Sequence, residues 1–439
     1  MAERKAALSS KKRFLRIVPI AFITYSLAYL DRSNFGSAVA GGMGNSLHIT
    51  AAVTSLLSSL FFFGYFFFQI PGAMYAEKRS PKKLVFFSLI VWGVLAAMTG
   101  IVTNVKYLYF IRFFLGIVES AIMPTMLIFL SSWFSKSERS RANSFLILGN
   151  PVTIMWMSIV SGYLLSNFGW KNMFIIEGLP PIVWAFVWWV LVKDKPSQAK
   201  WLTQEEKQEL ETVLREEQKE IAPVKNYVAA FKKPQVIALA LQFFFWSIGV
   251  YGFVMWLPSI IAKSSKIGMT GTGWLSALPY LIGTIMMLTA SYFSDKTMKR
   301  KVFVWVPLLI GGISFLLAYQ VGSSNFWLSY VLLCIAGGAI YTPNGTFFAM
   351  ITDLLPKNVA GVATALINSM GALGSFVGAY FVGYLNGATG SPAASFLLMA
   401  FSLVASVVLM FFVRKSKKVE SEKQAAMKNT VFSEIPVIK

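Results

Sequence analysis

Apolar runs of 18 residues or more recur along nearly the whole chain, and they limit the possible fold more than any other feature. A helix takes about 20 residues to cross the hydrocarbon core of a bilayer. We count twelve candidate spans, at roughly 16–38, 52–76, 84–103, 106–133, 142–166, 173–192, 235–262, 271–293, 302–320, 324–350, 359–385 and 392–413. Lipid offers no hydrogen-bond partners to the backbone, so we expect every span to be helical. The predicted fold class is an all-α membrane protein.

The loops between the spans alternate in charge. Most basic residues lie in the N-terminal segment, in the loops at 78–83, 136–141 and 296–301, in the 193–233 connector and after the last span. On the other side the basic residues are Lys106, Lys171, Lys263 and Lys266. Cytoplasmic loops carry the excess of Lys and Arg. The net charge of +21 therefore indicates a multi-pass inner-membrane protein with both termini in the cytoplasm, and no nucleic-acid partner is expected.

One long polar segment divides the chain into two halves. We predict six helices in residues 1–192, a cytoplasmic connector at 193–234, six helices in residues 235–413 and a cytoplasmic tail at 414–439. The connector contains KWLTQEEKQELETVLREEQKE, which predicts a surface helix with Thr203 as a possible N-cap. The tail is polar and lacks a periodic apolar face, so it is predicted to be disordered.

The two halves repeat a loop. GAMYAEKRSPKK at 72–83 follows the second span, and SYFSDKTMKRK at 291–301 follows the eighth. Each loop places an acid at a helix end, Glu77 or Asp295, with Lys78 or Lys296 directly after it. Repeated halves of this kind are typical of transporters whose halves move about a central site.

Four ionisable residues lie inside the spans of the first half: Asp31, Arg32, Arg112 and Glu119. An ionised side chain is costly in lipid, so such residues normally face a bundle interior or a watery path. Arg112 and Glu119 are seven residues apart, nearly two turns or roughly 10 Å, and share one helix face. The planar fork of an arginine can bond both oxygens of a carboxylate. We predict that Arg112 and Arg32 bind an anion; the alternative is that these groups only pair structurally with other helices.

The two acids, Asp31 and Glu119, are the predicted proton carriers. Burial favours the neutral form of a carboxyl group, whereas a nearby arginine favours the charged form. A carboxyl group balanced between these effects can gain a proton when a substrate occupies the arginine and release it afterwards.

Several neutral side chains are further candidates for substrate contact. Tyr29 and Tyr65 lie near the charged positions, Asn150 precedes a proline in the fifth span, and Asn344 lies in the tenth. Neutral donors and acceptors suit the hydroxyl groups of a sugar acid. The phenylalanine runs at 61–63 and 66–68 are expected to pack or to face lipid, and Glu177 is expected to form a helix-end hydrogen bond.

The chain has one cysteine, Cys334, and one histidine, His48. A single residue of each kind cannot supply a disulfide, a cysteine metal cluster or a histidine-based catalytic pair. We therefore expect no metal, no cofactor and no enzymatic activity.

The sequence resembles the major facilitator superfamily over essentially its whole length. The loops at 72–83 and 291–301 are similar to the family's cytoplasmic signature, although Glu77, Lys78 and Ser80 depart from its usual Asp, Arg and Gly; the resemblance implies that these loops gate the inner side. The motifs YLDRSNFGSA (29–38), GYFFFQIPGA (64–73), RFFLGIVESAIMP (112–124) and ERSRA (138–142) resemble the anion:cation symporter branch. That branch imports organic anions with protons, and Asn368 matches a position that it uses.

Within the branch, FITYSLAYLDRSNF, LILGNPVT, SIGVYGFVMWLPS and ALINSMGALGSFVGAYFVGYLNGATGSPAAS look most similar to bacterial 2-ketogluconate transporters. The tenth span reads YTPNGTFFA where that group has a sequence closer to YAPYGPFFA. The resemblance implies a monomeric proton-coupled symporter for 2-ketogluconate or a related aldonate or ketoaldonate.

The alternatives are an organophosphate:phosphate antiporter and a transporter of aromatic or other organic acids with the same fold. The absence of Lys and Arg from 235–262 argues against the antiporter, which usually sets arginines from both halves around the phosphate. A drug:proton antiporter usually carries a Gly-Pro-rich motif where this chain has LGNPVTIM.

Overall fold

The computed structural model describes residues 2–219, 231–265, 267–322, 325–355 and 357–413. Within these ranges the side chains at 2–9, 31, 136–137, 140, 218–219, 352–353 and 357–362 are outside the description. The predicted disorder of the tail and the side chain of Asp31 therefore fall outside the part of the protein that is described.

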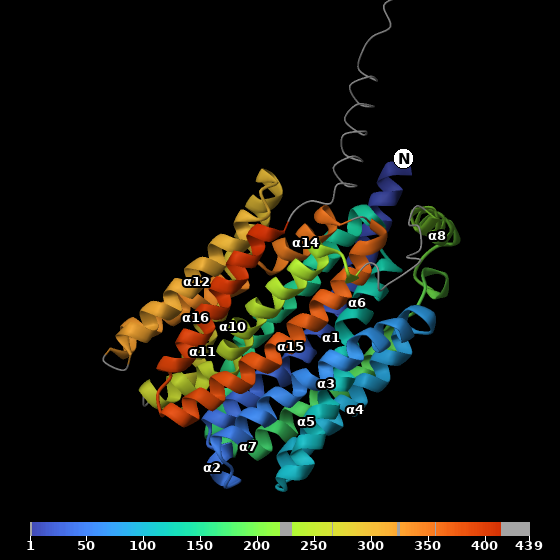
Figure 1. Cartoon of the computed structure of the whole chain (residues 1–439). Helices are drawn as coiled ribbons and strands as arrows, with labels where there is room; N and C mark the ends of the chain where they lie inside the picture. The colour runs from blue at the N-terminus through green and yellow to red at the C-terminus, as the bar shows by residue number, and fades with distance from the viewer. Residues whose placement is uncertain (1, 220–230, 266, 323–324, 356, 414–439) are drawn as a thin grey trace, which may run out of the picture.

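The chain folds into helices (Figure 1). They are α1 (Ala2–Ala40), α2 (Met43–Ser46), α3 (Ala51–Lys78), α4 (Pro81–Ile101), α5 (Val105–Ser120), α6 (Ile122–Ser131), α7 (Lys136–Leu191), the 3-10 helix η1 (Pro196–Gln198), α8 (Gln204–Lys219), α10 (Pro234–Ser265), α11 (Gly268–Thr297), α12 (Val302–Val321), α13 (Phe326–Tyr341), α14 (Asn344–Leu354), α15 (Lys357–Thr389) and α16 (Ala393–Phe412). The predicted all-α membrane fold is confirmed.

Eleven helical segments are long and apolar enough to cross a membrane in the described part of the chain, and one of them, in α7, holds two spans. Gly169 interrupts α7 with a non-helical φ of 72° and ψ of 169°. Ser161 Oγ donates to Glu177 Oε1 at 2.7 Å, although 16 residues of straight helix would separate them by about 24 Å. The chain therefore reverses at Gly169, and the twelve predicted spans are present.

Two spans are broken beside a proline. The predicted span 106–133 divides into α5 and α6 at Ala121, where Pro124 has no N–H to offer the carbonyl group of Ser120. The equivalent span of the second half divides into α13 and α14 at Thr342 and Pro343. Both breaks lie near the middle of the molecule, where they shape its centre.

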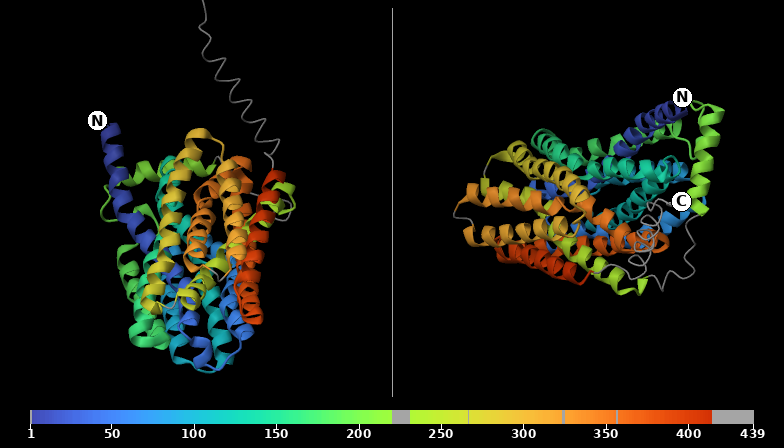
Figure 2. Two further views of the ribbon diagram at one scale, coloured as in Figure 1. Left: turned by 90° about the vertical axis from the view of Figure 1, so that its left-hand side faces the viewer. Right: turned by 90° about the horizontal axis from the view of Figure 1, so that it is seen from above.

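The two halves lie side by side, as the view from above shows in Figure 2. Along the boundary α3 packs against α15, α1 against α10 and α7 against α11. The N-terminus, α8 and the end of α16 lie at one end of the molecule, here called the connector end, whereas α2 lies at the opposite end, here called the α2 end (Figure 1).

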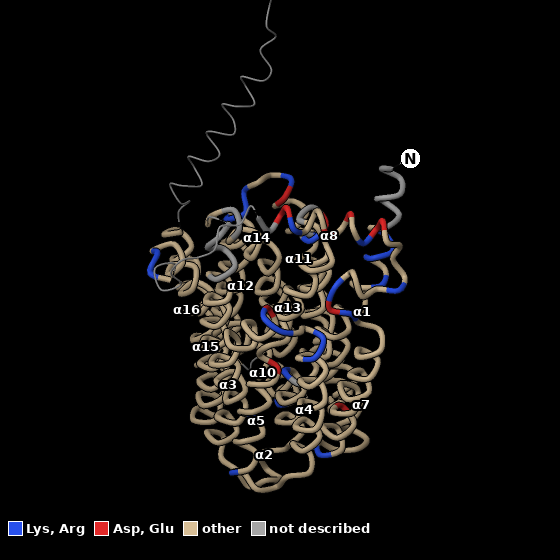
Figure 3. The backbone as a smooth tube through the Cα atoms, turned by 90° about the vertical axis from the view of Figure 1, so that its right-hand side faces the viewer, with Lys and Arg blue, Asp and Glu red and all other residues tan. Residues whose placement is uncertain are grey.

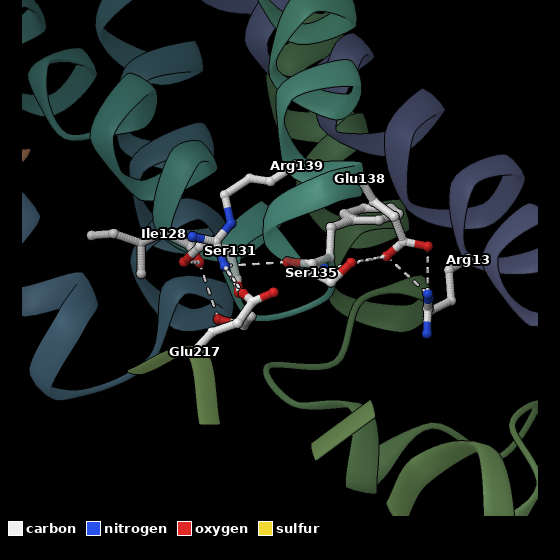
Figure 4. Close-up of polar contacts among 9 residues, drawn as sticks. Arg13, Ile128, Ser131, Ser135, Glu138, Arg139 and Glu217 are labelled. Atoms are coloured by element: carbon white, nitrogen blue, oxygen red, sulfur yellow. Dashed lines mark hydrogen bonds and ion pairs between the residues drawn. The ribbon is translucent and has the colours of Figure 1, made fainter. Parts of the chain in front are cut away.

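The connector is held on the first half by a charged contact of α8 and an aromatic contact of the segment before it. Arg139 of α7 pairs with Glu217 of α8 at 3.5 Å, beside a pair between Arg13 and Glu138 at 2.7 Å (Figure 4). Trp133 stacks on Trp201 with ring centroids 5.7 Å apart. These contacts tie the connector to the half that precedes it.

The predicted N-cap of the connector helix is present. The Thr203 hydroxyl accepts from the Glu206 amide at 3.2 Å, and the Glu206 carboxylate accepts from the Thr203 amide at 2.8 Å. This reciprocal pair satisfies two backbone donors that a helix start leaves without helical partners.

Charged residues gather at the connector end, while the rest of the tube in Figure 3 is largely tan. Glu77 and Lys78 are the last residues of α3, and Asp295 and Lys296 lie in the last turn of α11. Arg300 pairs with Asp295 at 2.8 Å. The predicted gating residues thus occupy equivalent helix ends in the two halves.

Candidate functional site

A cavity lies between the two halves, about midway along their helices. Its volume is about 70 Å³, which exceeds the roughly 15 Å³ that a cavity needs to hold a water molecule. Its polar lining among the described residues consists of Arg32, Asn150, Asn344, Asn368, Ser247, Ser375 and the tyrosines 25, 29, 65, 251 and 341. Arg32 is the one charged side chain in that described lining.

Arg32 is held by aromatic rings and by an acid. The guanidinium carbon lies 4.5 Å from the centre of the Tyr29 ring and 4.7 Å from that of Tyr65. Arg32 Nε lies 3.4 Å from Glu119 Oε2, and the two side chains are 6% and 0% exposed. Each desolvated cation–π contact stabilises by up to about 2 kcal/mol. The guanidinium thus lies at the cavity wall, and the Glu119 carboxylate partly balances its charge.

The spacing of α1 explains how one helix supplies this wall. Tyr25, Tyr29 and Arg32 are separated by four and then three residues, so they share one face of the helix. The two hydroxyl groups of Tyr25 and Tyr29 lie 2.9 Å apart. α1 thus presents two phenols and one cation to the same space.

Arg112 does not line this cavity in the structure. Its Nε donates to the carbonyl oxygen of Leu57 at 3.2 Å, and its guanidinium carbon lies 4.3 Å from the centre of the Phe35 ring. Phe61 contacts both arginines, at 5.4 Å from Arg112 and 5.5 Å from Arg32. Glu119 of α5 therefore forms an ion pair with the arginine of α1.

The second half and α7 supply amides to the cavity. Asn150 lies on α7, Asn344 on α14 and Asn368 on α15. Asn344 Nδ2 donates to the carbonyl oxygen of Tyr341 at 3.2 Å, and Asn368 Nδ2 lies 3.6 Å from Met123 Sδ. All three residues line the cavity together with Tyr29, Tyr65 and Arg32.

The predicted gating residues lie elsewhere. Asp31 precedes Arg32 on α1, and its side chain belongs to the part of the protein that is not described. Glu77 and Lys78 lie at the connector end, as do Asp295 and Lys296. These four residues are remote from the cavity and do not line it.

Glu177 differs from its expected role at a helix end. It is 3% exposed and accepts from Asn34 Nδ2 at 2.9 Å and from Ser161 Oγ at 2.7 Å. Both donors lie on other spans, so the carboxyl group joins α1 to the two arms of α7 inside the first half.

Sequence reasoning missed several residues of the lining. Phe62 lines the cavity although the run at 61–63 is expected to pack or to face lipid, and Tyr25 and Met123 line it as well. The shared face of Tyr25, Tyr29 and Arg32 could have revealed Tyr25. No sequence signal distinguishes Phe62 from its phenylalanine neighbours.

The chemistry of the lining favours an anion with several hydroxyl groups. One arginine can bind a carboxylate, while the amides and phenols around it can both donate and accept hydrogen bonds. The described lining from the second half is neutral. A small carboxylate substrate could therefore place its charge toward α1 and its hydroxyl groups toward the second half.

Comparisons with known proteins agree with the fold. The family model described as the Major Facilitator Superfamily matches residues 21–379 and 270–439. A protein of Agrobacterium vitis whose name describes it as a tartrate transporter is 29% identical over 95% of this chain and 93% of its own. A quinolone resistance transporter of Acinetobacter baumannii is 28% identical over 91% and 93% of the two chains.

A solved structure shares the same architecture. The crystal structure of a bacterial homologue of the human lysosomal transporter Spinster, in an inward-facing and unoccupied conformation, superposes with a TM-score of 0.70. It is 18% identical and covers 91% of this chain and 95% of its own. Together with the match of the family model over most of the sequence, this places the chain in the major facilitator superfamily.

Proposed function

We propose that the protein is a proton-coupled symporter that imports a polyhydroxylated carboxylate anion, of which 2-ketogluconate and related aldonates and ketoaldonates are the favoured members. The observation that carries the proposal is Arg32, a buried cation at the wall of the central cavity, paired with Glu119 and faced by neutral amides. A relative whose name describes it as a tartrate transporter supports the same class, because tartrate is also a hydroxylated carboxylate.

The pair of Arg32 and Glu119 suggests how substrate and proton are coupled. The carboxylate of Glu119 balances the guanidinium while the site is empty. A substrate carboxylate that binds Arg32 competes for that charge, and protonation of Glu119 removes the competition. Asp31 is the second proposed carrier, next to Arg32 in the chain.

The proposed direction of transport rests on the charge distribution. The connector end carries most of the Lys and Arg residues (Figure 3), and such an excess lies on the cytoplasmic side. We place the protein in the bacterial inner membrane with the connector end, and hence both termini, in the cytoplasm. The helix ends with Glu77, Lys78, Asp295 and Lys296 then form the proposed inner gating loops.

The organophosphate:phosphate antiporter remains the rival within the same fold. A phosphate group with two charges would be expected to draw cations from both halves, as two arginines bind better than one. The described lining from the second half offers Tyr251, Tyr341, Asn344 and Asn368 instead. These neutral groups favour hydroxyl recognition.

Counterflow in proteoliposomes tests the proposal. Vesicles loaded with one compound are diluted into its labelled form, for a panel of 2-ketogluconate, gluconate, tartrate, a uronate, an aromatic acid, a sugar phosphate and a quinolone. We expect exchange of at least one hydroxylated carboxylate and a response of net uptake to an imposed pH gradient. Exchange of the sugar phosphate or the quinolone without any of these carboxylates would overturn the assignment.

A further inference from the structure

Side chains of the two halves form hydrogen bonds at two levels, among those that the structure describes. At the α2 end the Ser166 hydroxyl accepts from the backbone amide of Thr270 at 3.0 Å. Near the cavity, Ser369 Oγ of α15 donates to Gln69 Oε1 of α3 at 3.2 Å, and both residues are 2% exposed. The second bond is buried, so water does not compete freely for it.

The bond between Gln69 and Ser369 lies on the connector side of the cavity. α3 runs from the α2 end toward the connector end, and Gln69 follows the cavity residue Tyr65 by four residues, about 6 Å along the axis. α15 runs the other way, and Ser369 follows Asn368, the first cavity residue of this helix, and comes before the cavity residues Ala372 and Ser375. A second contact at this level joins Asn368 to Met123.

The opposite side of the cavity is closed by backbone packing instead. A Cβ atom added at Gly36 would lie 2.4 Å from the carbonyl oxygen of Met255, and one at Gly162 would lie 2.7 Å from that of Met269. These glycines bring helices of the two halves into direct contact. The halves are therefore in close helix contact on the α2 side, whereas the buried hydrogen bond between them, among the described side chains, lies on the connector side.

We propose that Gln69 and Ser369, with Met123 and Asn368 beside them, form the inner latch of the transporter, and that a hydroxylated substrate releases it through Asn368. The inference rests on the proposed transport function and adds a role for Gln69, which lies in GYFFFQIPGA and does not line the cavity. When the latch is released, movement of α15 away from α3 opens the cavity toward the connector end.

The weak partner of Asn368 gives the latch its sensitivity to substrate. A thioether sulfur is a poor acceptor, and the side-chain nitrogen of Asn368 lies 3.6 Å from the sulfur of Met123. A substrate hydroxyl or carboxylate oxygen is a better acceptor for the same N–H group. A bound substrate therefore replaces an inter-half contact of α15 and weakens the latch at its neighbour Ser369.

Distances between labelled cysteines measure, without any substrate, how far each end of the molecule is open. In a Cys334→Ser background, Arg79→Cys and Met298→Cys report on the connector end, and Lys106→Cys and Lys263→Cys report on the α2 end. We expect Ser369→Ala and Gln69→Leu each to increase the ratio of open to closed molecules at the connector end by about fivefold. That factor corresponds to one hydrogen bond of about 1 kcal/mol.

The controls are substitutions of the same kind within one half. Ser402 bonds to its own helix at Met399, and Gln242 bonds to Ser406 within the second half. Ser402→Ala and Gln242→Leu should leave the connector-end distances unchanged. If Ser369→Ala and Gln69→Leu, both folded by size-exclusion chromatography, keep the wild-type distances, the latch is refuted.

A second arm tests the role of the substrate. Tartrate or 2-ketogluconate, whichever the protein exchanges, should increase the open population of the wild type but not that of Asn368→Ala at a saturating concentration. Met123→Leu should make the connector end more open before substrate is added, whereas Met126→Leu, buried nearby on the same helix, should not. Equal responses of wild type and Asn368→Ala would overturn substrate release. Absence of exchange by both compounds refutes the proposed substrates instead, and the measurements without substrate still decide the latch.

Discussion

At the scale of single residues, the two buried arginines are predicted to have different effects. Arg32 lies at the cavity wall, whereas Arg112 bonds to the Leu57 carbonyl and packs on Phe35. Arg32→Lys retains the charge but loses the planar fork, so substrate binding should weaken tenfold or more, about 1.4 kcal/mol. Arg112→Lys should change substrate affinity by less than about threefold, or 0.7 kcal/mol, and lower thermal stability. Substrate binding measured by calorimetry and unfolding curves of both variants check these two expectations. A larger loss of affinity in Arg112→Lys than in Arg32→Lys would identify Arg112 as the anion-binding residue.

Glu119 gives a second prediction at this scale. Glu119→Gln removes the charge beside Arg32 and imitates a permanently protonated carboxyl group. We expect this variant to bind and exchange substrate but to lose uphill uptake driven by protons. Counterflow and concentrative uptake are measured in the same vesicles, so that a folding defect would abolish both. Continued accumulation by Glu119→Gln would move the coupling site elsewhere, with Asp31 as the next candidate.

The sequence predicted which residues belong to the site better than it predicted which of them contact one another. Costly charges inside apolar spans are visible without any structure, and this singled out Arg32, Arg112 and Glu119. Their partners were not visible, because Arg32 and Glu119 are 87 residues apart and hydropathy does not specify how each helix is rotated. Arg112 and Glu119 lie two turns apart on one helix, whereas the structure shows an ion pair between Glu119 and Arg32 of α1.

At the scale of helices, close packing of α7 on α11 should hold the α2 end closed. A Cβ atom at Gly273 would lie 2.5 Å from the carbonyl oxygen of Ser158, which cannot move without the helix. Gly273→Ala should therefore separate the α2 ends of the two halves and shift the Lys106–Lys263 label distance upward. Gly312→Ala is the control, because its Cβ atom would meet nothing nearer than 3.4 Å. An unchanged distance in Gly273→Ala would show that α11 can shift without opening this end.

The start of α7 should make stability depend on pH. Burial raises the pKa of Glu138, but hydrogen bonds from Ser10 and Ser135 and the charge of Arg13 outweigh it and hold the pKa below its ordinary value of 4.5. The stabilisation is present above pH 4.5 and is lost as the pH falls through the lower pKa of the folded state. Glu138→Gln should lose roughly 1 kcal/mol or more at pH 7.

Thermal unfolding of purified Glu138→Gln and wild type at neutral and acidic pH measures this effect. The difference between the two proteins should shrink below pH 4.5. Glu209→Gln, a change at an exposed position of α8, serves as a comparison for the loss of one surface charge. A difference for Glu138→Gln that stays constant over this range would exclude a contribution from its ionised form.

The spans were predictable because length and hydropathy suffice to define them, and the cap residues Thr50, Ser80 and Asn104 mark three helix starts. The breaks at Ala121 and at Pro343 were not predicted. A proline inside an apolar run leaves the hydropathy unchanged, and whether it kinks or divides the helix depends on the helices packed around it. These breaks place Met123 and Asn344 at the cavity. The helix breaks, which the sequence did not predict, therefore help to form the site.

At the scale of the whole molecule, the number of protons decides which gradient drives uptake. A charge that moves through a potential of 100 mV changes in free energy by about 2.3 kcal/mol. The first half has two candidate proton carriers, Asp31 and Glu119, so we predict two protons per substrate. Import of a monovalent anion such as 2-ketogluconate would then carry one net positive charge inward, whereas import of divalent tartrate would carry none.

Uptake into vesicles with an imposed inside-negative potential and no pH gradient tests this stoichiometry. With two protons, the potential should drive accumulation of the monovalent anion and leave that of the divalent anion at its equilibrium level. A single proton would make monovalent uptake insensitive to the potential and would make divalent uptake slower as the inside becomes more negative. The signs of the two responses differ between the models, so one preparation and two substrates distinguish them without a measurement of absolute rates.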